Sequence, residues 1–155
     1  MLDADLTASL RYAHNLILGA IVGVLFLWII IYLSLGRMPN LSWLKNEWEI
    51  FFVLCVISPI LEEYVFRGII YEAIGRRYCG SWPSNKFVSI SIANSITTLL
   101  FVFAHIIARG PVAGALVIMP SIYLGLVRDR YGSIRICMAI HALWNISWFS
   151  LFAPV

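Results

Sequence analysis

Charged residues are scarce in this sequence. Of its 155 residues only 12% are Asp, Glu, Lys or Arg, whereas 61% are hydrophobic. Soluble domains carry about 25% charged residues, and a soluble core of this size cannot bury so much apolar surface. The composition therefore excludes an ordinary soluble domain and predicts that lipid covers much of the chain. The net charge of +3 is small and its basic residues are spread over loops, so we expect no nucleic-acid partner.

Several residue types and motifs that hydrolases use in membranes are missing. The only aspartates are Asp3, Asp5 and Asp129, and none lies in an apolar run, which excludes a two-aspartate site. There is no His-Glu-x-x-His zinc helix and no Gly-x-Ser-x-Gly nucleophile turn. The three cysteines match neither a zinc ribbon nor a disulfide framework. We expect Cys55 and Cys137, which lie in apolar runs, to be packing residues.

The apolar residues form five runs that can serve as membrane helices. A helix crosses the hydrocarbon core with roughly 20 apolar residues. The predicted spans are residues 16–35, 51–71, 87–107, 111–127 and 136–152. The first is long enough to span and is not followed by a small-residue cleavage site, so we do not expect a cleaved signal peptide. The predicted fold class is all-α: a polytopic membrane helix bundle with about five transmembrane helices, forming one integral membrane domain over residues 1–155.

Basic residues are distributed unequally between the two sides of these spans. With Arg67 set aside as embedded, one side holds Arg11, Arg76, Arg77, Lys86, Arg128, Arg130 and Arg135. The other side holds Arg37, Lys45 and Arg109. Because cytoplasmic loops carry the excess of Lys and Arg, we expect the N-terminus to be cytoplasmic.

The second predicted span contains an adjacent pair of carboxylates, Glu62 and Glu63, followed by Arg67. Ionisable groups inside a membrane are costly, and they normally pair with one another or take part in function. Glu63 and Arg67 are four residues apart and therefore share one helix face, so we expect them to form an ion pair. Glu62 then remains the less compensated carboxylate and a candidate general base or acid.

Two later spans repeat the four-residue spacing. Phe101 and His105 lie four apart in the third span, and His141 and Asn145 lie four apart in the fifth. A water molecule held by Glu62 and His105 would be activated for attack. Hydrogen bonds from His141 and Asn145 would stabilise a developing oxyanion. This inventory lacks a nucleophilic side chain and fits water-mediated amide hydrolysis.

Each of these residues also has a structural interpretation. A lone membrane histidine such as His105 often makes only an interhelical hydrogen bond, and Asn145 by itself is more often a packing contact. Arg67 is expected to be a structural counter-ion, and Phe101 a packing residue. A zinc site built from Glu62, His105 and His141 also stays open, because three protein ligands plus water is the catalytic zinc pattern.

Taken in order, these motifs resemble a known family. Glu62-Glu63-x-x-x-Arg67, Phe101-x-x-x-His105 and His141-x-x-x-Asn145 are similar to the motifs of the CAAX-protease and bacteriocin-processing (CPBP, or Abi) family. The runs Tyr123-Leu124-Gly125-Leu126 and Tyr131-Gly132-Ser133-Ile134 add to the likeness, which covers roughly residues 48–150.

The resemblance implies a metal-free, glutamate-type intramembrane endopeptidase. It assigns Glu62 and His105 to water activation and His141 and Asn145 to the oxyanion site, with no cofactor. Eukaryotic members remove the C-terminal tripeptide after a prenylated cysteine. Members commonly have more spans before the Glu-Glu helix than the single one here. We therefore expect a compact enzyme of a bacterial or archaeal cell membrane that processes C-terminal or leader segments of peptides or membrane-anchored proteins.

Two alternatives to an enzyme remain at this stage. Buried Glu and His side chains also form proton relays, so a proton-coupled transporter subunit is one. A non-catalytic immunity or binding protein on the same scaffold is the other.

The enzyme hypothesis requires His105 and His141 to lie at similar depths. Straight helices starting at residues 87 and 136 would leave the imidazoles of His105 and His141 ~20 Å apart in depth. We expect the polar stretch 89–98 to begin outside the hydrocarbon, which would bring His105 toward mid-depth.

Overall fold

The computed structural model of the chain describes residues 14, 18–25, 29, 32, 42–78 and 90–151. All elements in this part of the chain are helical, which confirms the all-α prediction for it. The chain divides into two compact units, one of residues 1–48 with 146–155 and one of residues 49–145. The second unit contains every residue that the sequence nominates for the site. The first unit contains α2 (Trp43–Asn46). The prediction of a single membrane domain stays a prediction.

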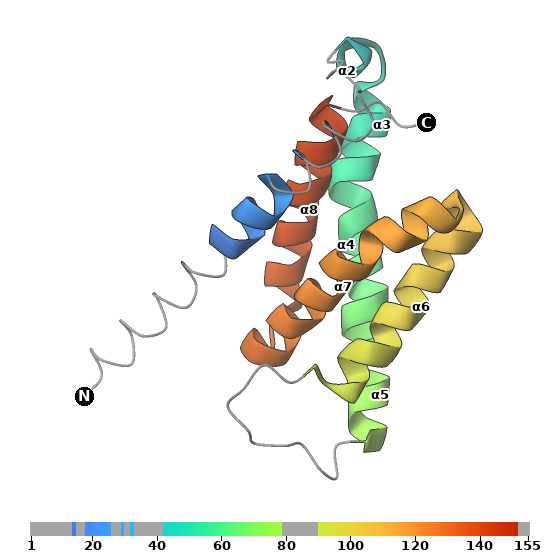
Figure 1. The fold of residues 1–155 in the computed structure, drawn as a ribbon, viewed down its shortest axis with the longest axis vertical. Coiled ribbons are helices and arrows are strands. Elements are labelled where there is room, and N and C mark those ends of the chain that lie inside the picture. Colours follow the sequence, from blue (N-terminus) through green and yellow to red (C-terminus); the bar gives the residue numbers. More distant parts are fainter. Residues whose placement is uncertain are drawn as a thin grey trace. The chain divides into compact units, whose positions relative to one another are not determined.

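The Glu-Glu motif lies in one uninterrupted helical stretch. Five consecutive elements make it up: α3 (Trp48–Phe52), the π-helical η1 (Val53–Ile57), α4 (Ser58–Glu63), the π-helical η2 (Tyr64–Ile70) and α5 (Tyr71–Tyr78). The junction residues Ser58, Tyr64 and Tyr71 all have right-handed helical dihedral angles. The predicted span 51–71 is therefore a helix throughout, but its turns alternate between α and π geometry. Figure 1 shows this stretch in cyan to green.

The third predicted span is α6 (Ile92–Arg109), which begins later than the predicted residue 87. Ser91 sets this start, because its Oγ accepts a hydrogen bond from the backbone N–H of Asn94 at 3.0 Å and caps the helix. Residues 87–89 lie outside the described part of the chain. The helix ends at Gly110, whose φ of 88° favours glycine.

Helix α7 (Pro111–Tyr131) turns back after α6 and contacts it, and Figure 1 shows the two helices at an angle to each other, joined at one end. The contact depends on two glycines. A Cβ on Gly125 would lie 1.8 Å from Asn94 Oδ1, and one on Gly114 would lie 2.3 Å from Ile106 Cγ1. Small residues allow membrane helices to approach closely. Gly132, with φ of 63°, then ends α7 in a left-handed cap.

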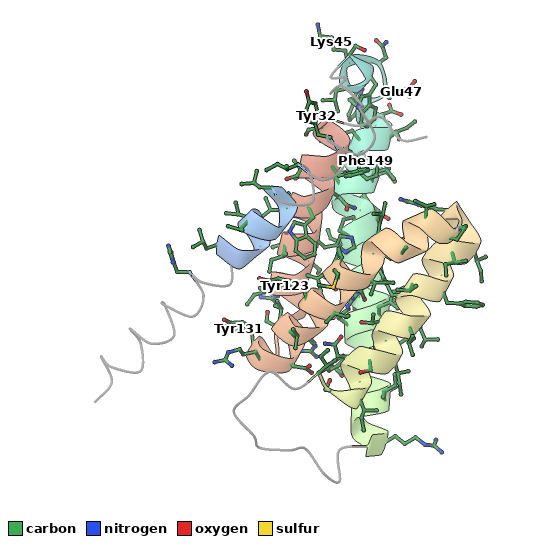
Figure 2. All side chains as sticks on the ribbon, viewed as in Figure 1. Tyr32, Lys45, Glu47, Tyr123, Tyr131 and Phe149 are labelled. Atoms are coloured by element: carbon green, nitrogen blue, oxygen red, sulfur yellow. The ribbon has the colours of Figure 1, made fainter. Side chains whose placement is uncertain are left out.

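Helix α6 has an apolar outer face and a polar inner face. Leu99, Phe103 and Ile107 are four residues apart and are 69%, 60% and 71% exposed. Asn94, Thr97 and Thr98 are buried instead. Part of the polar stretch thus faces protein within the described unit, whereas Ser95 is exposed, and the position of this stretch relative to the hydrocarbon stays a prediction. Figure 2 shows the side chains of α6 and α7 projecting from their ribbons, with Tyr123 and Tyr131 labelled on α7.

Two of the described helices are long and apolar enough to cross a membrane, namely α6 and α7. The fifth predicted span corresponds to α8 (Ile134–Leu151). Residues 18–25 of the first predicted span are helical, as are residues 29 and 32, and the rest of it lies outside the described residues. A count of five transmembrane helices is not confirmed, and the cytoplasmic N-terminus remains a prediction.

Candidate active site

Glu63 and Arg67 form a buried ion pair. Arg67 Nη1 lies 3.1 Å from Glu63 Oε1, and the two side chains are 1% and 0% exposed. The four-residue spacing places both groups on one face of the helix, as predicted. The guanidinium compensates one of the two carboxylates in this apolar environment, which confirms the predicted pairing.

A second helix pair holds the other side of the Arg67 guanidinium. Arg67 Nη2 donates to the backbone oxygen of Ser121 at 3.0 Å and to its Oγ at 2.6 Å. The Ser121 hydroxyl donates to Thr98 Oγ1 at 3.1 Å, and Thr98 donates to Asn94 Oδ1 at 3.2 Å. The guanidinium also lies 4.7 Å from the centre of the Phe101 ring. Arg67 is thus the point at which η2, α6 and α7 are joined by polar contacts.

His141 of α8 lies between the two glutamates. Its Nδ1 is 2.8 Å from Glu63 Oε1, and its Nε2 is 3.8 Å from Glu62 Oε2. Because a carboxylate accepts, the contact with Glu63 places a proton on Nδ1. Glu63 therefore does more than pair with Arg67, since it also orients the imidazole so that Nε2 faces Glu62. The sequence interpretation assigned Glu63 only the first of these roles.

Ser58 holds the other oxygen of Glu62. Its hydroxyl donates to Glu62 Oε1 at 2.6 Å, one helical turn earlier in α4. The Glu62 side chain is 23% exposed, whereas Glu63 is fully buried. Glu62 is thus the more accessible carboxylate, with one oxygen held and the other directed toward His141.

His105 and Phe101 lie together on α6. His105 Nδ1 is 3.0 Å from the Phe101 carbonyl oxygen, which can only accept, so this nitrogen carries a proton. The His105 ring lies 4.3 Å from the Phe101 ring centre, and the His141 ring lies 6.2 Å from it. The two imidazoles therefore flank one aromatic ring, and the separation in depth expected for straight helices does not arise. Phe101 is buried, in agreement with its predicted packing role.

Asn145 lies one turn after His141 in α8, and its side chain bonds to the backbone of another helix. Its Nδ2 donates to the carbonyl oxygen of Leu54 in η1 at 2.8 Å. One of the two amide hydrogens is therefore committed to the helix that carries Glu62. The second hydrogen remains for another acceptor.

Sequence reasoning missed the residues that support this site. Ser58 had a usable signal, because it precedes Glu62 by the same four residues that relate Glu63 to Arg67. Ser121 and Thr98 had none, because Ser121 reaches Arg67, and Thr98 reaches Ser121, only across contacts between different helices. The Leu54 carbonyl was also not predicted, because Pro59 alone does not reveal the π turn before it or the Asn145 amide that binds this carbonyl.

The described residues contain no group of three or more His, Cys, Asp or Glu side chains arranged to hold a metal ion. Cys55 and Cys137 are both free and buried. The site offers a partly exposed carboxylate, Glu62, whose Oε2 lies 3.8 Å from Nε2 of His141, together with His105 on α6 and the Asn145 amide on α8. This set can remove a proton from water and donate hydrogen bonds to a carbonyl oxygen.

Comparison with known proteins gives two matches to this chain. The family model described as type II CAAX prenyl endopeptidase Rce1-like matches residues 44–147. The chain is also similar to the membrane-embedded CAAX protease MroQ of Staphylococcus aureus (strain USA300), with 41% identity over 56 residues. That alignment covers 36% of this chain and 21% of the relative. No solved structure matches the chain.

Proposed function

Because this chain belongs to the Rce1-like family of type II CAAX prenyl endopeptidases, we propose that it is an intramembrane endopeptidase of the glutamate type. Its substrates are peptides or membrane-anchored proteins whose C-terminal or leader segments reach the membrane face. The observation that carries this proposal is the position of His141, which contacts Glu63 and faces the more exposed Glu62. A purely structural ion pair between Glu63 and Arg67 would not need either a second carboxylate or an imidazole beside it.

In the proposed reaction, Glu62 takes a proton from a water molecule, and the resulting hydroxide attacks the carbonyl carbon of the scissile peptide bond. His105 orients the water through Nε2, because its Nδ1–H is bonded to the Phe101 carbonyl. The protonated Glu62 then returns its proton to the leaving nitrogen as the C–N bond breaks. One carboxyl group thus serves as base and then as acid, and no covalent enzyme intermediate forms.

His141 and Asn145 are proposed to stabilise the oxyanion. With Nδ1–H directed at Glu63, His141 donates from Nε2 only when that nitrogen also carries a proton. The charges then balance, because the imidazolium and Arg67 offset the carboxylates of Glu62 and Glu63. Asn145 would contribute the amide hydrogen that Leu54 does not use.

The test compares protein termini in membranes of cells that carry the wild-type chain or the Glu62→Gln variant. We expect a set of new C-termini or N-termini in the wild type that is absent from Glu62→Gln and from His105→Ala, since each change removes a group that activates water. Glu49→Gln is the matched control, because Glu49 is an exposed glutamate on the same helical stretch. Identical termini in wild-type and Glu62→Gln cells would contradict the proposed function.

A further inference from the structure

The helix that carries Glu62 contains a carbonyl with no backbone donor. In η1 the N–H of Ser58 bonds to the Val53 oxygen, in the i to i−5 pattern of a π turn. The next carbonyl, that of Leu54, would receive the N–H of residue 59 in the same pattern. Residue 59 is proline and has no N–H. The Leu54 carbonyl therefore receives a hydrogen bond neither from the N–H of Ser58, as in an α turn, nor from residue 59, as in a π turn.

A side chain from another helix supplies the missing donor. Asn145 Nδ2 lies 2.8 Å from the Leu54 oxygen, and this contact joins residues 91 positions apart in the chain. Backbone polar groups in an apolar environment need a partner, and neighbouring helices can provide it where proline frees a carbonyl. Leu54 lies one helical turn before Ser58 and two turns before Glu62, on the same helical stretch that carries both side chains.

The second π turn also has a carbonyl that is bound by a side chain from another helix. At the end of η2 the N–H of Tyr71 bonds to the carbonyls of Phe66 and Gly68 and not to that of Arg67. The Arg67 carbonyl accepts from Nε of Arg128 in α7, at 3.1 Å. The α4 turn with its two glutamates is therefore flanked on both sides by π turns, each with a carbonyl that accepts a hydrogen bond from a side chain of a different helix.

We infer that Asn145 replaces the backbone donor that Pro59 removes, and that through the Leu54 carbonyl it positions the turn carrying Glu62. This inference rests on the proposed function for its catalytic consequence, but the hydrogen bond itself does not depend on it. Asn145 is then a positioning residue for Glu62 as well as a proposed oxyanion donor. The effects of substituting Pro59 and Asn145 on stability should therefore be coupled, although Asn145 bonds to the Leu54 carbonyl and not to Pro59.

The test is a double-mutant cycle with Asn145→Ala, Pro59→Ala and the combined variant, measured as thermal unfolding and as peptide hydrolysis in detergent or proteoliposomes. Asn145→Ala alone leaves the Leu54 carbonyl unpaired and should lower the unfolding temperature. Pro59→Ala restores a backbone N–H at the position that lacks one. In the combined variant we expect Pro59→Ala to recover most of the unfolding temperature lost in Asn145→Ala. We also expect the fall in kcat caused by Asn145→Ala to be about tenfold smaller, which is within the range of coupling energies between neighbouring residues.

Pro120→Ala is the matched control, because Pro120 also lies inside a helix, α7. It should not reduce the effect of Asn145→Ala on either readout. If Asn145→Ala does not fold, recovery of folding by Pro59→Ala supports the inference, and failure of the combined variant to fold overturns it. Additive effects of the two changes in the unfolding temperature also overturn it.

The two readouts separate this inference from the proposed function. A wild-type chain that cleaves no substrate would remove the proposed function, while the unfolding cycle would still test the bond between Asn145 and Leu54. An active wild type with an inactive Glu62→Gln variant and no coupling between residues 59 and 145 would leave the function standing and remove the positioning role.

Discussion

At the scale of single residues, the two adjacent glutamates have different environments. Glu63 is fully buried between Arg67 and His141, whereas Glu62 is part-exposed and held by Ser58. Glu62 and Glu63 have different contacts because successive side chains on a helix point about 100° apart. Glu63 organises charged partners, and Glu62 keeps one oxygen available for the proposed proton transfer.

Ser58→Ala should slow hydrolysis without changing the fold. The substitution removes a 2.6 Å hydrogen bond to Glu62 Oε1 and frees the carboxylate to rotate away from His141. Hydrogen bonds to charged groups contribute about 1.5–3 kcal/mol, so we expect kcat/KM to fall by roughly tenfold to a hundredfold. Ser95→Ala, which removes an exposed hydroxyl bonded to the Ser91 carbonyl, is the control. Equal turnover of Ser58→Ala and wild type would remove Ser58 from the site.

Arg67→Ala should destabilise the protein and also reduce activity. It leaves the buried Glu63 carboxylate without its counter-ion and removes the bonds to Ser121. Breaking a buried ion pair by removing one partner costs about 3–5 kcal/mol, which should appear as a lower thermal unfolding temperature. Arg77→Ala, an exposed arginine farther along the same helical stretch, should unfold as the wild type does. An unchanged unfolding temperature for Arg67→Ala would show that Glu63 does not need its partner.

At the scale of elements, the α6–α7 pair supports the site through its close approach. Gly125 admits the Asn94 side chain, whose Nδ2 donates to the Ile122 carbonyl and whose Oδ1 accepts from Thr98. Thr98 in turn contacts Ser121, which binds Arg67. The glycine is therefore linked to the buried ion pair by packing and by a series of hydrogen bonds.

Gly125→Ala should lower the unfolding temperature, although alanine is the better helix former. A Cβ there would lie 1.8 Å from Asn94 Oδ1, so either the Asn94 side chain would have to leave its hydrogen bonds or α6 and α7 would have to separate. Gly75→Ala in α5 is the matched control, because its added Cβ meets nothing within 4 Å. In that open position the change should stabilise the helix by about 1 kcal/mol or less. If both variants gain stability, the close approach of α6 and α7 is not required.

At the scale of the whole molecule, hydrolysis should proceed without a bound metal ion. We expect activity to persist in the presence of strong chelators, and purified protein to contain much less than one zinc per chain. The physical reason is that Glu62 can accept the proton of water directly, so no Lewis acid is needed to activate it. The measurement is turnover after chelation, together with metal analysis of the same sample. Activity that is lost on chelation and restored by zinc would instead assign Glu62, His105 and His141 as zinc ligands.

The sequence by itself determined the class of the protein and much of its site. An apolar composition, four-residue spacings and buried charges act locally, through lipid exposure and the geometry of one helix. They predicted the all-helical fold, the Glu63–Arg67 pair and the burial of Phe101. They also nominated Glu62, His105, His141 and Asn145, whose catalytic roles remain proposals.

Only the tertiary structure decided which groups meet across helices. Contacts between segments far apart in the chain include the placement of His141 between two glutamates, the bond from Arg67 to Ser121, the bond from Ser121 to Thr98, and the bond from Asn145 to Leu54. These contacts depend on helix register, on the glycines that let α6 and α7 approach, and on the π turn before Pro59 that leaves the Leu54 carbonyl without a backbone donor. Such features arise from packing between helices, and the spacing of residues within one helix does not specify them.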